Sequence, residues 1–433
     1  MINSEKNLLR SIVVGLAFSL STTLASAEVA EGTVLSKSNI DQLYEDSFDG
    51  HKIKDLLTEK MEMMIRDFDM VMRLEKSTEV KFPSHYWDAG KVNQGKATLG
   101  ADGKSVEGFV AGIPFADITQ DDPMAGWKLE WNHFYANPLI GDSWAALGDV
   151  WVTTNEGGVI DNFEAVSAKA IMEGRTEGEA NIAGDKDHAR YLLVLTEPYD
   201  AKGLGVFTKQ YNNGKLDDGW VYIKNLRRTR RTAGGKTWMD PQPKMDLLND
   251  DNQTVLGFPA FYQDFKVIGK RWILAVVNAP DPNVAHDPKD FVDLDNPPHW
   301  VPTPKANPWQ PREVWIVEAT PPEEHPYGKK VMYMDVNFPM YYLAEIYDKK
   351  GDFWRIWRQS YSPSKTASGE PTLAFIMTQA IDFQRQRATF INIEYMFTNW
   401  LEQKWFDQSV LKKAASGAFQ KELESVRQRY LKN

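Results

Sequence analysis

The sequence predicts a mainly β (α+β) protein built around a large antiparallel sheet with one apolar face. Short alternating runs of apolar and aromatic residues follow one another from residue 147 to residue 360, and each ends at Gly, Pro, Asn or Asp. Alternation with a period of two is typical of strands, and these ending residues favour turns. Aromatic residues are also frequent, with Trp 15, Tyr 16 and Phe 21. This count suits an aromatic-lined cavity, and it suits an ordinary β core nearly as well.

The first residues predict export. Lys6 and Arg10 precede an apolar, uncharged stretch at residues 11–24, and Ala25-Ser26-Ala27 then forms an A-x-A cleavage sequence. This is the layout of a secretory signal peptide, so we expect residues 1–27 to be removed and the mature chain to start near Glu28. The apolar stretch is shorter than the roughly 20 residues that span a bilayer. The A-x-A form resembles bacterial signals, which predicts a periplasmic protein.

Composition argues against several classes of function. Cys 0 leaves no disulfide, no lipidated cysteine, no thiolate nucleophile and no cysteine-based metal site. The formal net charge of -10 argues against nucleic acid as the main partner, because phosphate binding needs a basic surface. No segment after the signal peptide is apolar enough to cross a membrane.

The N-terminal region of the mature chain, about residues 51–146, is predicted to be helical or irregular. Over residues 53–75, apolar side chains recur near a 3.6 period at Ile53, Leu56, Leu57, Met64, Phe68, Val71 and Met72. This spacing predicts a helix that packs on the sheet. Residues 76–126 are rich in Gly, Pro and Asp, which indicates loops, and residues 127–146 could form a further helix.

The strands follow in order. A hairpin is predicted where residues 149–154 turn at Gly157-Gly158. Further strands are expected at residues 190–196, 219–232, 272–277, 313–319, 330–336, 341–347 and 353–360, with 388–397 as a closing strand. Residues 280–311 hold many prolines, and a loop of that length in a compact domain is usually functional. The tail at about residues 400–433 is expected to be helical, and residues 28–433 are expected to form one domain.

Several motifs, taken in order, resemble the domain-of-unknown-function 1329 family. They are Gly112-Ile113-Pro114-Phe115 with Trp131-Asn132, Asn225-Leu226-Arg227-Arg228-Thr229-Arg230-Arg231, Gly257-Phe258-Pro259 leading into Phe261 and Asp264, Arg312-Glu313-Val314-Trp315-Ile316-Val317-Glu318-Ala319, and Tyr347-Asp348-Lys349-Lys350-Gly351-Asp352-Phe353-Trp354-Arg355. The resemblance runs from about residue 50 to about residue 405. No single motif is diagnostic, but their order and spacing together are fairly specific. Members of the family are exported bacterial proteins, often described as outer-membrane lipoprotein-sorting-like.

The family is similar to the lipoprotein carriers LolA and LolB. The resemblance therefore implies their fold, an unclosed antiparallel β half-barrel with helices covering its concave face, and a lipid or other hydrophobic ligand. Family members are often encoded near resistance-nodulation-division (RND) type exporters and outer-membrane proteins, which implies such partners. Because this chain has no cysteine to lipidate, a soluble shuttle fits better than an anchored acceptor. The family has no established catalytic residues, so the resemblance implies neither an enzyme nor a cofactor.

Aromatic and Met side chains on the predicted strands are candidates for lining a ligand cavity, because they adapt to varied chain shapes. The candidates are Trp151, Trp220, Tyr222, Trp272, Trp315, Tyr333, Met334, Trp354 and Trp357. Trp354 and Trp357 are three apart, so we expect them on opposite faces of a regular strand. For each candidate the alternative is ordinary core packing.

One concentrated basic cluster stands out in the sequence. It consists of Arg227, Arg228, Arg230 and Arg231. One interpretation is a clamp for a phosphate or carboxylate head group at the cavity rim, or a docking patch for an acidic partner. The other is cross-strand pairing with nearby acids such as Asp246, Asp250 and Asp251.

Catalytic and metal-binding motifs are missing from the sequence. The histidines are scattered without an H-E-x-x-H spacing, and there is no G-x-S-x-G elbow. We therefore expect a periplasmic carrier that hands a hydrophobic ligand between envelope components. Two alternatives remain open. One is a glycan- or surface-polymer-binding protein that stacks tryptophans on sugar rings in an open, wet groove, and the other is a non-catalytic adaptor of an envelope complex.

Overall fold

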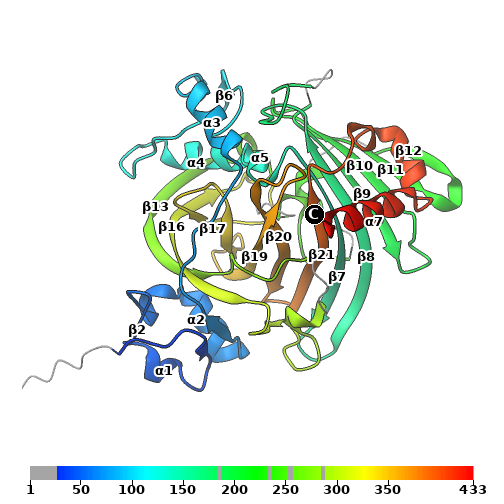
Figure 1. The fold of residues 1–433 in the computed structure, drawn as a ribbon. Coiled ribbons are helices and arrows are strands. Elements are labelled where there is room, and N and C mark those ends of the chain that lie inside the picture. The colour runs from blue at the N-terminus through cyan, green and yellow to red at the C-terminus, as the bar shows by residue number, and fades with distance from the viewer. Residues whose placement is uncertain are drawn as a thin grey trace, which may run out of the picture.

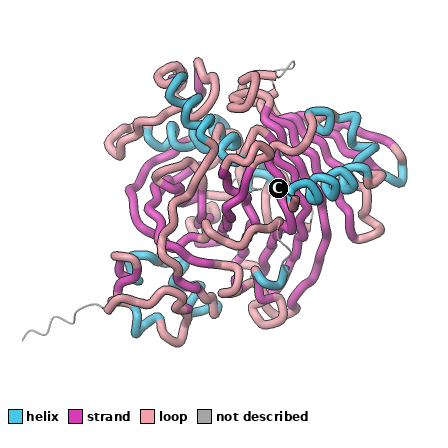
Figure 2. The backbone as a smooth tube through the Cα atoms, in the orientation of Figure 1, coloured by secondary structure: helices cyan, strands magenta, loops and turns pink. Residues whose placement is uncertain are grey.

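The computed structural model describes residues 27–182, 187–232, 237–242, 244–251, 257–283 and 288–432. The expected signal peptide lies almost wholly outside these residues. Within them, one 15-stranded sheet forms the body of the protein (Figures 1 and 2). The segment with α1 and α2 lies at one end of the sheet, and the segment with α3 and α4 lies at the other (Figure 1).

The sheet is a long antiparallel succession of strands. From one edge to the other they are β13 (Asp264–Ala275), β16 (Pro308–Thr320), β17 (Lys329–Asp335), β18 (Tyr341–Tyr347), β19 (Phe353–Lys365), β20 (Pro371–Asp382), β21 (Arg387–Thr398), β7 (Ser143–Thr154), β8 (Gly158–Ile171), β9 (Ala189–Glu197), β10 (Gly205–Gln210), β11 (Asp218–Ile223) and β12 (Arg228–Arg231). The short strand β4 (Met72–Leu74) pairs in parallel with the start of β16 and antiparallel with β1 (Val34–Leu35).

The sheet does not close. Among the described residues, β12 pairs with β11 alone at one end of the sheet. At the other end β16 pairs with both β13 and the short β4, and β13 and β1 have no further partner strand, so the edges are β12, β13 and β1. This confirms the predicted mainly β fold with a large, unclosed antiparallel sheet. The expected strands along β13, β16, β17, β18 and β19 are consecutive neighbours, and β21 is the closing strand expected at residues 388–397.

Helices are short and lie outside the sheet. They are α1 (Ile40–Leu43), α2 (Glu59–Phe68), α3 (Ser84–Asn93), α4 (Ala125–Phe134), α5 (Asn137–Ile140), α6 (Leu411–Ala414) and α7 (Ala418–Tyr430), with 3₁₀ turns η1 (Ile53–Leu56), η2 (Lys224–Leu226), η3 (Thr237–Met239), η4 (Asn249–Asp251), η5 (Pro259–Phe261), η6 (Pro288–Asp290), η7 (Gln403–Trp405) and η8 (Gln408–Val410). The remaining strands form three two-stranded units: β2 (Ser47–Phe48) with β3 (His51–Lys52), β5 (Thr98–Leu99) with β6 (Val106–Glu107), and β14 (Val292–Asp293) with β15 (Val301–Pro302).

Two expected elements were wrong because the backbone breaks or turns within them. The helix expected at residues 53–75 is divided into η1, α2 and β4. Leu57 is extended (φ -108, ψ 133) and ends η1, and Asp69 in the left-handed region (φ 55) ends α2. The strand expected at residues 219–232 is a hairpin of β11 and β12, with Arg227 left-handed (φ 49) at the turn.

Three apolar cores hold the sheet and its covering segments together. In the largest, Met61, Met64 and Ile65 of α2 pack with strand residues such as Leu343 and Ile356. A second core packs α6 and α7 on β7 to β11. α7 also contacts β21 and runs across the neighbouring strands in Figure 1. A third core packs α4 and described residues such as Trp238, Leu247 and Tyr262 on β16 to β20.

The third core includes a segment that crosses the sheet. The chain leaves β12 at one edge and enters β13 at another, and the described residues between them, 237–242, 244–251 and 257–263, lie against the sheet. We call residues 232–263 the crossing segment. Its described apolar side chains, including Trp238, Leu248 and Tyr262, share a core with Trp315 and Trp357 of the sheet. The sheet is therefore unclosed in its hydrogen bonding, and the crossing segment covers part of one face.

Candidate functional site

The most promising site lies under α2. Thr58 starts this helix, since its hydroxyl accepts a hydrogen bond from the backbone N–H of Met61 at 3.2 Å. The helix buries Met61, Met64 and Ile65 against the sheet and directs polar residues outward. On that outer side, Arg66 pairs with the carboxylate of Asp41 at 2.8 Å. The helix is therefore held mainly by an apolar face rich in methionine.

Two small cavities flank Met64 beneath this helix. The first is lined by Met61, Met64, Leu274, Ala275, Val276, Trp309, Tyr342, Leu343, Arg358 and Gln359. The second is lined by Met64, Phe68, Met70, Trp300, Val301, Pro302 and Ile381. Each has a volume of about 10 Å³, which is room for about one water molecule. The packing beneath α2 therefore leaves little empty space. The side chain of Met64 lines both cavities and lies between them.

The first cavity has a polar wall. Arg358 on β19 is only 3% exposed. Its Nε donates to Oε1 of Gln379 at 2.9 Å, and its Nη1 donates to Oγ of Ser360 at 3.2 Å. Both partners are neutral, and burial lowers the pKa of Arg358 to about 9. The guanidinium carbon lies 5.1 Å from the ring centre of Trp309, which lines the same cavity.

The predicted cavity residues do not gather at one place. Three of them contact the core of α2, two lie under α6 and α7, and four lie in the core of the crossing segment. The first group is Trp151, Trp272 and Tyr333, the second Trp220 and Tyr222, and the third Trp315, Met334, Trp354 and Trp357. None of the nine lines either of the two cavities beside Met64.

Trp354 and Trp357 contradict the expectation that they face opposite sides of the sheet. The pairing of β19 with β18 shifts between Arg355 and Phe353, which leaves Trp354 as an extra residue in a β-bulge. Both indoles consequently pack in the core of the crossing segment. Trp357 donates to the backbone carbonyl of Asp251 at 2.8 Å, and Trp354 donates to the carboxylate of Asp382 at 2.8 Å. The sequence did not show the bulge.

The four arginines of the basic cluster lie at the free edge of the sheet. Arg227 ends η2, and the other three lie on β12 with exposed side chains. Arg231 forms an ion pair with Asp218. The alternative of cross-strand pairing therefore holds for Arg231, but with Asp218 and not with the three aspartates named as examples, since Asp246, Asp250 and Asp251 are buried and pair with other cations. Asp246 instead pairs with Arg387 at 2.9 Å.

Asp250 and Asp251 belong to a buried ionic network that attaches the crossing segment to the sheet. Lys330 of β17 lies between them, with its Nζ 3.0 Å from Oδ2 of Asp250 and 2.9 Å from Oδ1 of Asp251. Burial acts to lower the pKa of Lys330, but the two carboxylates outweigh it and raise that pKa. His325 lies 3.3 Å from Asp250, and Tyr327 donates to Asp251 at 2.5 Å. We interpret this network as structural, since its charges satisfy one another.

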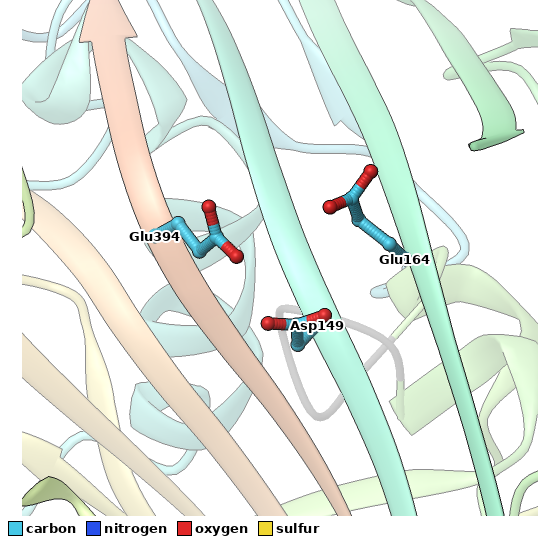
Figure 3. Close-up of side chains that lie close together, drawn as sticks. All are labelled: Asp149, Glu164 and Glu394. Atoms are coloured by element: carbon cyan, nitrogen blue, oxygen red, sulfur yellow. The ribbon is translucent and has the colours of Figure 1, made fainter. Parts of the chain in front are cut away.

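Sequence reasoning missed a cluster of three carboxylates. Asp149 of β7, Glu164 of β8 and Glu394 of β21 place ligand-type oxygens within 4.8 Å of one another (Figure 3). Burial and the hydrogen bond with Glu394 raise the pKa of Asp149 to about 7. The oxygens could hold a hard cation, or a proton shared between Asp149 and Glu394 could relieve the repulsion. Asp149 and Glu164 lie opposite each other on the hairpin of β7 and β8, but Glu394 comes from β21, which is distant along the chain, so no sequence signal brings the three together.

A comparison with known protein families identifies the family of this chain. A family model described as "Protein of unknown function (DUF1329)" matches residues 34–412. The chain belongs to the DUF1329 family. This confirms the resemblance seen in the sequence motifs. No curated protein matches the sequence.

Solved structures with similar chains are distant in sequence. A DUF1329 family protein from Desulfovibrio piger ATCC 29098 is 18% identical, covers 67% of this chain and 99% of its own, and has a TM-score of 0.45. A putative outer membrane lipoprotein-sorting protein domain from Vibrio parahaemolyticus is 15% identical, with coverages of 62% and 91% and a TM-score of 0.41. A LolA superfamily protein from Nitrosomonas europaea is 12% identical, with coverages of 65% and 98% and a TM-score of 0.38.

The helices of this DUF1329 chain have no membrane-spanning character. Across the described residues, no helix is both long and apolar enough to cross a bilayer. α7, which ends at Tyr430, carries charged residues along one side and buries Phe419, Leu423 and Val426 on the other. It is thus a helix that packs on the sheet.

Proposed function

We propose that this DUF1329 protein is a non-catalytic periplasmic carrier, which binds a lipid or other hydrophobic molecule between α2 and the sheet. The observation that supports this most is the pair of cavities separated by Met64. Methionine is flexible and fills irregular apolar space at low cost, so a change of its rotamer can open or join such cavities. The segment around α2 is rich in it, at Met61, Met63, Met64, Met70 and Met72.

Ligand entry requires α2 to move, because each cavity holds only about 10 Å³. The helix is suited to such movement. The ion pair between Arg66 and Asp41 is near the surface and contributes little, and Tyr44 also donates to Glu62 of the helix at 2.9 Å. The apolar face of the helix contacts the sheet through flexible side chains. Each buried methylene of an incoming chain contributes about 0.8 kcal/mol. An alkyl chain of roughly ten methylenes can therefore replace the contacts that α2 gives up.

The remaining parts of the proposal concern the envelope. The signal-like residues 1–27 support export to the periplasm. Exposed arginines at the free edge strand β12 offer a docking surface for an acidic region of an RND-type inner-membrane transporter or an outer-membrane protein. An edge strand also has unpaired backbone groups, which a partner strand can join. We infer that hand-off takes place at this edge.

Glycan binding is less well supported by the structure. Stacking on sugar rings needs tryptophan faces in an open groove, yet all fifteen tryptophans lie in described residues and none is among the exposed hydrophobic side chains. Nine of them are buried, and the other six are half-buried and pack against the apolar cores, which indicates core packing or contact with an enclosed ligand. A ligand of this protein is therefore expected to be apolar over most of its length.

The test is native mass spectrometry of protein purified from the periplasm, with extraction of any bound lipid. Because the chain has no cysteine, Met63→Cys on α2 can carry an environment-sensitive fluorophore, and Lys421→Cys on α7 is the matched control. We expect a co-purifying hydrophobic molecule, and a fluorescence change on α2 but not α7 when oleate is added. Protein without bound lipid that also gives no signal with oleate would refute the carrier proposal.

A further inference from the structure

We propose that the ligand carries an anionic head group, which binds the guanidinium of Arg358 and the indole N–H of Trp309 in the cavity beneath Met61 and Met64. This inference rests on the proposed function and specifies its ligand as an anionic amphiphile. The head group is a carboxylate or a phosphate, since a guanidinium binds either with paired hydrogen bonds.

The main observation behind this proposal is that Arg358 is a buried cation with no carboxylate partner among the described residues. Arg358 is 3% exposed. Its polar neighbours are the side-chain oxygens of Gln379 and Ser360, and Nη2 has only the sulfur of Met377, at 4.0 Å. Among the described residues, no carboxylate forms an ion pair with Arg358. A guanidinium has five donor hydrogens, so this one retains capacity for an acceptor.

Two other arginines buried in the same sheet serve as an internal comparison. Arg312 pairs with Asp335 at 2.9 Å, and Arg355 pairs with Asp382 at 3.0 Å. Both carboxylates are fully buried beside their arginines. The fold thus supplies a partner in those two cases, as the cost of burying an isolated charge requires. Arg358, which lines the first cavity, has no such carboxylate partner among the described residues.

A second donor without a partner lies in the same place. The indole Nε1 of Trp309 is buried and has no hydrogen-bond partner in the described part of the chain. Its ring lines the first cavity together with Arg358. Buried polar groups are nearly always hydrogen-bonded, so an orphan donor needs an explanation. An anionic oxygen between the indole N–H and the guanidinium would satisfy both groups.

The residues that line the two cavities indicate how the ligand would be oriented. Apart from Arg358, Trp309, Tyr342 and Gln359, the first cavity is lined by aliphatic and Met groups such as Leu274. Beyond Met64, the second cavity is apolar, with Phe68, Met70, Trp300 and Ile381 in its wall. When Met64 and α2 move, the head group would lie on Arg358 and the alkyl chain would extend toward Ile381.

The experiment compares oleate with oleyl alcohol, which has the same chain and no charge, using calorimetric titration of the full mature protein. Wild-type protein should bind oleate at least about tenfold more tightly than the alcohol. Arg358→Met should lose about tenfold in oleate affinity and keep its affinity for the alcohol. Trp309→Phe, which removes the N–H donor and keeps a smaller aromatic ring, should weaken oleate binding less than Arg358→Met does and leave the binding of oleyl alcohol less affected than that of oleate. Oleoyl lysophosphatidate as a third ligand distinguishes phosphate from carboxylate as the preferred head group.

The outcomes separate this inference from the proposed function. If wild-type protein binds oleate and oleyl alcohol equally and Arg358→Met changes neither, the anionic head group is refuted while the carrier proposal stands. If neither ligand binds wild-type protein, the carrier proposal itself fails. Should Arg358→Met not fold, the wild-type preference between the two ligands and the effect of Trp309→Phe still decide the question.

Discussion

Lys330→Met should strongly destabilise the protein, because it leaves two buried carboxylates without their shared cation. Lys330 is 0% exposed, and its Nζ contacts Asp250 at 3.0 Å and Asp251 at 2.9 Å. Removing one partner of a buried ion pair costs about 3–5 kcal/mol. That is a large fraction of the about 5–15 kcal/mol by which folded proteins are stable. The crossing segment should detach first, since η4 carries both aspartates.

The assay is urea unfolding at pH 7, followed by tryptophan fluorescence. Lys52→Met is the matched control: Lys52 pairs with Glu45 at 2.9 Å on the surface, and its loss should leave the midpoint unchanged. The triple variant Lys330→Met, Asp250→Asn, Asp251→Asn removes the charges together and should recover part of the lost stability.

The pH dependence gives a second check. In the wild type, burial acts to raise the pKa of Asp250, but Lys330 and His325 outweigh it and lower that pKa, so the carboxylate contributes stability that is lost as pH falls below about 4. Without Lys330, the same carboxyls should take up protons more readily. The difference in free energy of unfolding between variant and wild type should therefore shrink as pH falls from 7 toward 4. A loss of less than about 1 kcal/mol at pH 7, or a gap that widens on acidification, would refute the reasoning.

Two further predictions concern the carboxylate cluster and the cap of α2. Asp149 has its pKa raised to about 7 by burial and by Glu394, above its unfolded value of about 3.9, so the folded protein loses stability as pH rises through this window. Asp149→Asn should therefore raise the melting temperature at pH 8 and change it little at pH 4; an equal effect at both would contradict this. Thr58→Ala removes the N-cap of α2 and should cost about 1 kcal/mol in unfolding experiments. If α2 is the moving element, this variant should also take up oleate faster in stopped-flow fluorescence, and an unchanged rate would argue against it.

The period-two alternation predicted the β sheet well, because that signal is local. Runs such as residues 341–347 and 353–360 are short and rich in apolar and aromatic residues, and the turn residues between them mark their ends, which identifies them as strands. The same local reasoning failed at residues 53–75, where apolar spacing continues across a break at Leu57 and a left-handed Asp69. Periodicity reports which side chains face the core, and it does not report where the backbone stops being helical.

The sequence predicted the candidate site less well than it predicted the fold. Aromatic residues on strands were natural candidates, yet none of the nine lines the cavities beside Met64. Arg358 was not singled out, because its lack of a carboxylate partner depends on strands that meet only in the folded sheet. The aspartates near the arginine cluster were assigned to the wrong cations for the same reason. Proximity along the chain placed Asp250 near Arg231, whereas the fold places it beside Lys330.

Three properties of this protein can be read from its sequence: it is mainly β, it has no cysteine, and it carries motifs of the DUF1329 family. These properties follow from composition, local alternation and the order of short motifs. Only the tertiary structure decided which groups share an environment, and it placed Arg358, Trp309 and Met64 from three separate segments around one cavity. Burial and charge pairing are relations between distant segments, so the chemistry of the site appears only when the sheet brings them together.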